Sequence, residues 1–441
     1  MSEDKTIKAT CIRKCYGETL SKLSVLMTTT EYDMIKVGGL SAALTALVNS
    51  LKKYAEVQII LPRSGFEPSW KKLEQRQYPN VAIKVFENDG IKIYTLSNEI
   101  LDLSEIYPSP QNEKGIIKID EFCKRLEEIV DYMDFDVVHM QDFFAYKAMD
   151  KFHVMGKPIL LTIHRLHREN PAWFSGEKIA LEKADYITVV GESYYKEDEK
   201  ELFENYRGKV TRVFNGIDTG FWSVTACFAP ELSRFERRKK VLEKYGLTDG
   251  VLYIYVGRFD PVQKGVDILL KASQGFLETE NARMMIIGVG DKNLERASQE
   301  LEKKLPSKLK VINKLLAASD VRDLYSSADF ALIPSIFEPL GLVQLEAMSC
   351  ECIPIGSKTG GIKDTVISYG DNSAGATGFL VEKGKAESLL EAMKHALSLY
   401  REKPEIIERM RKNGRKRCEE VFQWDASSRQ YFELYKKLLK K

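Results

Sequence analysis

The chain has 441 residues, with 66 Lys or Arg against 64 Asp or Glu, so its formal net charge is only +2. This balance gives no electrostatic footprint for a protein dedicated to nucleic acids or to a membrane surface. Hydrophobic residues make up 44% and charged residues 29%. Such values are ordinary for a globular protein with a sizeable core, and the length favours roughly two or three domains.

Signals for membrane insertion and secretion are not found in the sequence. No apolar run approaches the roughly 20 residues needed to cross a bilayer, and the first residues lack the apolar stretch of a signal peptide. The seven cysteines are odd in number and have no metal-type spacing. We therefore expect neither a disulfide framework nor a zinc module, and we predict a reducing cytoplasm as the compartment.

Short apolar runs alternate with amphipathic helical patterns in the first half of the chain. Apolar residues recur at helical spacing over residues 40–51 and again over residues 119–133. This alternation predicts a parallel sheet with helices on both faces. The strands expected here are residues 23–29, 57–61, 136–139, 159–163, 186–190 and 210–214.

A second series of the same kind follows. Its expected strands are residues 251–256, 283–287, 328–333 and 351–355, separated by helices such as 265–272 and 321–326. The two series predict two doubly wound α/β domains that face each other across a cleft.

The segment between the two series, residues 223–240, is polar and irregular at first and then densely basic. We interpret it as the domain linker, so the first domain covers residues 1–222 and the second begins at residue 223. The basic run 234–240 predicts a solvated helix rather than a nucleic-acid patch, and the same interpretation applies to residues 409–417.

Ligands of open α/β sheets bind beyond the carboxyl ends of the strands, so the turns after the strands are the candidate sites. In the first turn, Gly38 and Gly39 open a helix and allow close approach of the backbone to a ligand, and Lys36 could supply a charge to a phosphate. The alternative is a tight loop with a solvated lysine.

Two cations bracket the turn that follows residues 251–256. Arg258 offers a bidentate fork and Lys264 a compact charge, and together beside a helix N-terminus they would clamp a diphosphate. Such a clamp would stabilise a departing nucleotide diphosphate. The alternative is that both are ordinary surface charges.

Two glutamates separated by seven residues follow the strand 328–333. Glu338 lies in the loop, and a helix begins near Gly341 and carries Glu346 on an apolar face. One carboxylate could bind sugar hydroxyls and the other a ribose, while the free N–H groups at the helix start suit a phosphate. Because an unpaired carboxylate on an apolar face is costly, we expect a partner for Glu346. A structural salt bridge is the alternative.

Three further turns of the first domain carry polar residues. His139 and Asp142 follow one expected strand, His164 and Arg165 follow the next, and Asn215 begins a tight turn with Gly216. A single histidine at a strand end is usually just a satisfied polar residue. Several such turns converging on one cleft favour a functional site.

The order of these motifs resembles the retaining starch and glycogen synthases of the GT-B glycosyltransferase architecture, collinear over residues 36–424. The elements that carry the resemblance are KVGGL, the Asp142 turn, TIH, FNGID followed by Trp222, GRFD with QKGVD, SIFEPLGLVQLEAM, TGGIKDTV and FQWD. The glutamate pair and the Arg/Lys clamp are shared with other retaining GT-B families. KVGGL and FNGID point to the synthases.

The resemblance implies a role for each motif. The catalytic residues would be His164, near the anomeric carbon, together with the clamp residues Arg258 and Lys264 and with Glu338, which would bind glucose hydroxyls. Glu346 would bind the ribose, and Asp142 would be a sugar-side contact. The other donor-binding residues would be Lys36, Gly38, Gly39, Asn215, Leu342 and Val343.

The chain departs from its bacterial relatives at four positions. Phe143 and Phe144 follow Asp142 where a Trp-His pair is usual, Ile336 replaces an arginine, and Leu340 replaces a cysteine. These changes concern the acceptor and sugar side and leave the phosphate clamp intact. The family also implies a final helix, residues 424–441, that crosses back to the first, acceptor-side domain, so the nucleotide-sugar domain ends at residue 423.

The implied reaction transfers glucose from ADP-glucose or UDP-glucose to the non-reducing end of an α-1,4-glucan, with retention of configuration. The leaving phosphate can take the proton of the attacking hydroxyl, so no metal or organic cofactor is expected, and neither is a nucleic-acid or membrane partner. The alternatives are a retaining transferase with a small acceptor, which would make trehalose or sucrose, and a catalytically silent binding homologue. A phosphorylase is disfavoured because no pyridoxal-binding lysine segment is recognisable.

Overall fold

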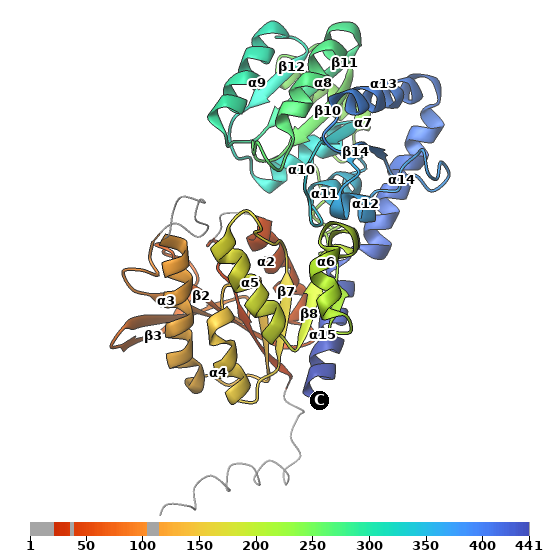
Figure 1. Ribbon diagram of the computed structural model, residues 1–441. Coiled ribbons are helices and arrows are strands. Elements are labelled where there is room, and N and C mark those ends of the chain that lie inside the picture. Colours follow the sequence, from red (N-terminus) through yellow and green to blue (C-terminus); the bar gives the residue numbers. More distant parts are fainter. Residues whose placement is uncertain (1–21, 36–38, 104–113, 441) are drawn as a thin grey trace, which may run out of the picture.

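The computed structural model describes residues 22–35, 39–103 and 114–440, which form two α/β lobes (Figure 1). Within these residues the first lobe holds a nine-stranded sheet of order β3-β4-β5-β2-β1-β6-β7-β8-β9, and the second a six-stranded sheet of order β12-β11-β10-β13-β14-β15. The two parallel-sheet lobes confirm the predicted class of two doubly wound α/β domains.

The first sheet is parallel except at one edge. Its parallel strands are β1 (Ser24–Thr28), β2 (Glu56–Pro62), β5 (Ile91–Ser97), β6 (Val137–Gln141), β7 (Ile159–Ile163), β8 (Tyr186–Val189) and β9 (Val210–Arg212). An antiparallel hairpin, β3 (Lys71–Tyr78) with β4 (Val81–Asn88), extends the sheet beyond β5. The six expected strands are confirmed, although the last ends at Arg212. The hairpin and β5 were not predicted.

Side chains of the central strands alternate between two covered faces. Leu26 of β1 packs with helices α3 (Lys114–Ile129), α4 (Met149–Val154) and α5 (Pro171–Lys183). Its neighbours Val25 and Met27 pack on the other face with α2 (Gly39–Leu51) and α15 (Trp424–Leu439). This is the period of two that a strand requires, and it explains why both faces are apolar.

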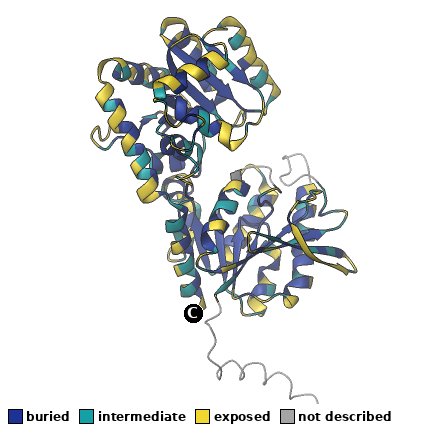
Figure 2. Ribbon diagram, turned by 180° about the vertical axis from the view of Figure 1, so that it is seen from behind, coloured by how far each residue is buried: buried dark blue, intermediate teal, exposed yellow. Residues whose placement is uncertain are grey.

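The second sheet is built in the same way. Its strands are β10 (Val251–Val256), β11 (Ala282–Ile287), β12 (Leu309–Ile312), β13 (Phe330–Ile333), β14 (Ile353–Ser357) and β15 (Phe379–Val381). One face is covered by α8 (Val266–Thr279), α9 (Lys292–Lys304), α13 (Ala386–Glu402) and α14 (Pro404–Val421). The other face is covered by α7 (Arg234–Lys244), α10 (Ala318–Ser327) and α11 (Val343–Ser349). Figure 2 shows the strands dark blue between helices with yellow outer faces.

The last helix leaves the second lobe and packs on the first. After α14, the chain passes Gln423, which bridges to Ile217, and α15 then lies against α2 (Figure 1). A Cβ atom on Gly216 would overlap the backbone of Trp424. The segment at Gly216, where the chain leaves the first lobe, is therefore in direct contact with the segment at Trp424, where the chain returns to it. The expected final helix is present as Trp424–Leu439.

The lobes also meet beside α12 (Gly360–Thr365). The carboxylate of Asp364 accepts hydrogen bonds from the backbone N–H of Glu192 at 2.6 Å and from the hydroxyl of Ser193 at 2.6 Å. Lys363 forms an ion pair with Glu197 nearby. These contacts fix the loop after β8 against the second lobe.

The two basic runs are helical, and the expectation that they are solvated is correct only in part, because Lys239, Lys240 and Lys416 are exposed whereas other basic residues are buried. Arg238 of α7 and Arg411 of α14 are buried and share the carboxylate of Asp329, at 2.5 and 3.0 Å. Arg234 donates to the carbonyl oxygen of Cys350 at 2.7 Å. Long-range pairing with acceptors far along the chain removes these guanidinium groups from water.

No helix in the described ranges is long and apolar enough to traverse a lipid bilayer.

Candidate functional site

The candidate site lies where the parallel strands of the two lobes end. In the second lobe the turns after β10 and β13 are neighbours, because these strands pair with each other. The backbone N–H of Ile336 donates to the carbonyl oxygen of Gln263 at 2.8 Å and joins the two turns directly.

Lys264 and Glu338 form an ion pair between these turns. The ammonium group lies 2.5 Å from a carboxylate oxygen, and the side chains are 17% and 10% exposed. Gly265 makes this approach possible, since it has a φ of +62° and its Cβ would overlap the carbonyl oxygen of Pro334. The ammonium group of Lys264 and the carboxylate of Glu338 therefore lie side by side and partly exposed at the carboxyl ends of the strands.

Arg258 is less constrained than Lys264. Its side chain is 59% exposed, and its guanidinium lies 3.3 Å from the side-chain oxygen of Gln263 and 3.8 Å from Asp260. Both contacts are long, so most of its donors face solvent. Such a side chain is free to form a bidentate contact with an anion.

Glu346 lies on α11, and the structure does not supply the partner that the sequence predicted for it. Among the described residues, no group is bonded to its carboxylate, and burial raises its pKa to about 7. A desolvated carboxyl group with unused bonding capacity is a candidate for ligand recognition.

The residues around α11 connect this site to the segments at Gly216 and Trp424, where the chain passes between the lobes. Leu342 packs with Ile217 and Trp424, and Val343 packs against the core of the second lobe. Asn215 is 8% exposed and immediately precedes the crossing at Gly216. Asn215 is thus brought to the junction of the two lobes.

Asp142 and His164 are brought together in the first lobe. Asp142 has a φ of +55°, and its carboxylate accepts the backbone N–H of His164 at 2.7 Å. Burial raises the pKa of Asp142 to about 7 and lowers that of His164 to about 4. The imidazole is therefore neutral near pH 7, and its Nε2 atom lies 2.8 Å from Oε1 of Gln141.

The neighbours of His164 and Glu338 touch across the lobes. The guanidinium of Arg165 lies 5.8 Å from the ring centre of Phe337, and the ring of Tyr194 lies 5.7 Å from the same ring. The hydroxyl of Tyr194 in turn accepts the backbone N–H of Leu166 at 2.8 Å. The turn that carries His164 and the turn that carries Glu338 are therefore adjacent.

The first glycine turn is described only in part. Gly39 begins α2, whereas Lys36 and Gly38 lie outside the described residues.

Phe143 and Phe144 are buried and pack with Trp173 in the core. These rings occupy the interior rather than the surface of the turn.

A turn that supports Arg258 was not predicted from the sequence. Gly290, after β11, bridges to Phe259, and Asp291 donates its backbone N–H to the carbonyl oxygen of Phe259 at 2.7 Å. A Cβ atom on Gly288 would overlap the carbonyl oxygen of Gly257. The Gly-Val-Gly-Asp pattern after an apolar run was the signal for this close packing of two turns.

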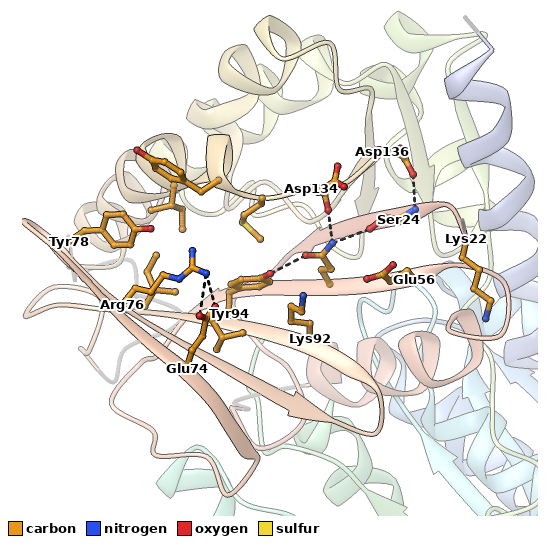
Figure 3. Close-up of a pocket in the computed structure, with 16 residues that line it drawn as sticks. Lys22, Ser24, Glu56, Glu74, Arg76, Tyr78, Lys92, Tyr94, Asp134 and Asp136 are labelled. Atoms are coloured by element: carbon orange, nitrogen blue, oxygen red, sulfur yellow. Dashed lines mark hydrogen bonds and ion pairs between the residues drawn. The ribbon is translucent and has the colours of Figure 1, made fainter. Parts of the chain in front are cut away.

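A cleft of about 820 Å³ opens at the opposite edge of the first sheet (Figure 3). Its lining includes Ser24 and Glu56, the first residues of β1 and β2, and Lys92 near the start of β5. None of the predicted site residues that the structure describes lines this cleft. It lies at the amino ends of the parallel strands, away from the turns described above.

Two family models match the chain. The model described as starch synthase catalytic domain matches residues 24–207, and the model described as glycosyl transferases group 1 matches residues 237–417. Each match falls within one lobe, and together they span most of the sequence.

Curated relatives are similar over nearly the whole length. A glycogen synthase from Finegoldia magna is 25% identical, with 95% of this chain and 100% of the relative covered. A glycogen synthase from Bacillus cereus is 28% identical, with 92% of this chain and 97% of the relative covered.

Solved structures share the two-lobed fold. The catalytic domain of starch synthase IV from Arabidopsis thaliana, bound to ADP and acarbose, has a TM-score of 0.79 at 20% identity and covers 96% of this chain and 100% of its own. Sucrose-phosphate synthase from Thermosynechococcus elongatus has a TM-score of 0.71 at 20% identity and covers 95% and 100%. At these identities the likeness establishes the fold alone.

Proposed function

Because the chain belongs to the starch and glycogen synthase family of GT-B glycosyltransferases, we propose that it transfers glucose from ADP-glucose or UDP-glucose to the non-reducing end of an α-1,4-glucan. We propose further that the anomeric configuration is retained. The glycogen synthases among its relatives and the ADP and acarbose named for the starch synthase structure support this assignment.

The donor would bind on the second lobe. Arg258 and Lys264 would hold the diphosphate, with Leu342 and Val343 contributing from the start of α11, after the neighbouring strand β13. The loop of Lys36, Gly38 and Gly39 would reach over from the first lobe. Glu338 would accept bonds from glucose hydroxyls and Glu346 from the ribose. The ion pair between Lys264 and Glu338 supports this arrangement, because a glucosyl phosphate offers a charge to the first and hydroxyls to the second.

The contact between Arg165 and Phe337 carries the proposal. It joins the turn of His164 to the turn of Glu338, so a glucose held by Glu338 would meet the neutral His164 ring. Asp142, which fixes the backbone of His164, and Asn215 would complete the sugar-side contacts.

The reaction proposed for this site exchanges one bond at the anomeric carbon. The 4-hydroxyl oxygen of the glucan forms a bond to that carbon, the bond to the diphosphate oxygen breaks, and the hydroxyl proton passes to the leaving phosphate. The chain contributes positioning and stabilisation of the developing charges. Closure of the lobes would exclude water and prevent hydrolysis of the donor.

The test measures nucleotide release from ADP-glucose and UDP-glucose with glycogen, and in parallel with glucose or fructose. Release that depends on glycogen, with α-1,4-linked product, is expected. Release with small sugars alone would instead indicate a transferase with a small acceptor, and no release would indicate a silent binding homologue. The five described cysteines are free thiols, which supports assay under reducing, cytoplasm-like conditions.

A further inference from the structure

A buried chain of polar side chains runs from the final helix to His164 in the candidate site. The hydroxyl of Tyr435 on α15 lies 2.7 Å from Nδ1 of His139 on β6. Nε2 of His139 lies 3.1 Å from the amide nitrogen of Gln141, whose oxygen lies 2.8 Å from Nε2 of His164. Three hydrogen bonds thus connect a helix that belongs to the C-terminal sequence with the histidine of the first-lobe turn.

The inner members of this chain have no access to water. Tyr435 and His139 are 0% exposed and Gln141 is 1% exposed. A buried polar atom that loses its partner is costly, so each donor must face an acceptor. Burial also lowers the pKa of His139 to about 3, and the neutral ring therefore has one donor nitrogen and one acceptor nitrogen.

The orientation of the Gln141 amide fixes the protons on both sides. Its oxygen faces His164, so Nε2 of His164 carries a proton and donates it. Its nitrogen faces Nε2 of His139, and the hydroxyl of Thr162 lies 2.7 Å from the same atom. An amide N–H can only donate and a hydroxyl can donate, so Nε2 of His139 accepts from both, and the proton of that ring is on Nδ1 and is donated to Tyr435. Reversing one ring would place two donors or two acceptors face to face unless the amide also turned. The two tautomers are consequently coupled.

We propose that Gln141 is a positioning residue for His164 and that Tyr435, acting through His139, determines which nitrogen of the His164 ring carries the proton. The functional consequence rests on the proposed role of His164 beside the donor glucose, whereas the coupling itself does not. The final helix would then influence the tautomer of His164, in addition to packing against the first lobe.

Two tyrosines one turn apart on α15 provide a matched pair of variants. Tyr435→Phe removes the hydroxyl that contacts His139. Tyr431→Phe removes a hydroxyl that lies 3.4 Å from Thr162, while its ring packs 4.9 Å from that of His139. Both tyrosines are fully buried, so the variants are matched in burial. They differ in that the Tyr435 hydroxyl contacts His139 directly, whereas the Tyr431 hydroxyl reaches it only through Thr162, which can still donate to Nε2 when that hydroxyl is removed.

The first measurement is the tautomer of each histidine, by nitrogen-15 NMR of the ligand-free protein. The chain has five histidines, and the signals of His139 and His164 are identified by their loss in His139→Gln and His164→Ala. In the parent protein we expect the proton on Nδ1 of His139 and on Nε2 of His164. Tyr435→Phe should shift both rings toward the opposite tautomer, and Tyr431→Phe should leave them unchanged.

The second measurement is the kinetics with the donor. Displacement of a positioned group commonly costs 10-fold or more in rate, so Tyr435→Phe and Gln141→Leu should lower kcat by roughly 10-fold with the donor KM changed less than about twofold. Tyr431→Phe should retain the parent kcat. If Gln141→Leu does not fold, the tyrosine pair decides alone.

Three results would overturn the inference: the opposite tautomers in the parent protein, unchanged His164 signals in Tyr435→Phe, or equal losses of kcat in both tyrosine variants. The NMR result needs neither donor nor glucan. A protein without transferase activity but with the expected signals would therefore refute the proposed function and leave the coupling standing.

Discussion

Lys264 and Glu338 are 74 positions apart in the sequence, and their charged groups lie 2.5 Å apart at the ends of two adjacent parallel strands. Each limits the freedom of the other, since both side chains are mostly buried. A ligand that enters between them must offer negative charge to the lysine and hydroxyl groups to the glutamate. The pair is consequently the position at which charge recognition and sugar recognition meet.

Replacing Lys264 with Ala should lower kcat by about 100-fold or more, the usual scale for removing a group that stabilises transition-state charge. Glu338 would also lose its partner and repel the diphosphate. The measurement is nucleotide release with glycogen. Lys271→Ala, at an exposed position of α8 in the same lobe, is the control and should retain activity. Full activity of Lys264→Ala would refute the clamp.

Glu346 should make stability depend on pH. Its pKa is raised from the usual 4.5 to about 7, so between these values the carboxyl group is ionised in the unfolded chain and neutral in the folded one. Stability is therefore lost as pH rises from about 4.5 to 7, by up to about 3 kcal/mol. Glu346→Gln cannot ionise and should become progressively more stable than the parent across this range.

Thermal unfolding of both proteins between pH 4.5 and 8 provides the check. Because Asp142 and other titrating groups are present in both, the difference between the two curves isolates Glu346. A difference that does not vary with pH would contradict the raised pKa.

The strands were predictable because the central ones are buried on both faces and are read as continuous apolar runs. The edge strand β3 was not, since seven of its eight residues are exposed and the segment is polar. Its pairing with β4 depends on backbone hydrogen bonds, which leave no mark in the side-chain pattern. The short edge strands β12 and β15 were missed as well.

The turns of the candidate site were predictable for a related reason, because ligands of such sheets gather at the strand ends. What could not be predicted was pairing over long separations. His139 is 296 positions from Tyr435, and no local pattern marks the contact. The burial of Arg238 and Arg411 within the basic runs was not predicted for the same reason, as their acceptor Asp329 lies elsewhere in the chain.

Asp329 should be essential for the stability of the second lobe. It is 1% exposed and accepts hydrogen bonds from Arg238, from Arg411 and from the backbone N–H of Leu252. Asp329→Ala would remove the buried counter-ion that two guanidinium groups share and leave Arg411 only its pair with the exposed Glu408. Breaking a buried pair in this way commonly costs about 3–5 kcal/mol. Urea denaturation measures the loss, with the exposed Asp371→Ala as the control. A loss no larger than that of the control would show that the buried pairs are not important for stability.

Gly191 should be needed for the contact between the lobes. It follows β8, and a Cβ atom there would overlap the carbonyl oxygen of Pro339, next to Glu338. Gly191→Ala must therefore push the loop after β8 away from the second lobe, which disturbs the bonds from Glu192 and Ser193 to Asp364. Overpacking of this kind costs about 1–3 kcal/mol, and the altered spacing between the turns of His164 and Glu338 should lower kcat/KM by roughly 10-fold.

Gly275→Ala is the matched control for this substitution. Gly275 lies within α8, and a Cβ atom there would meet nothing within 4 Å. Because alanine favours a helix over glycine by up to about 1 kcal/mol, this variant should be neutral or slightly more stable, with unchanged activity. Urea denaturation and glycogen-dependent nucleotide release on both variants separate the two effects. Equal stability and equal kcat/KM would mean that the loop after β8 can move without cost, and that the approach of the two lobes at Pro339 does not set the geometry of the site.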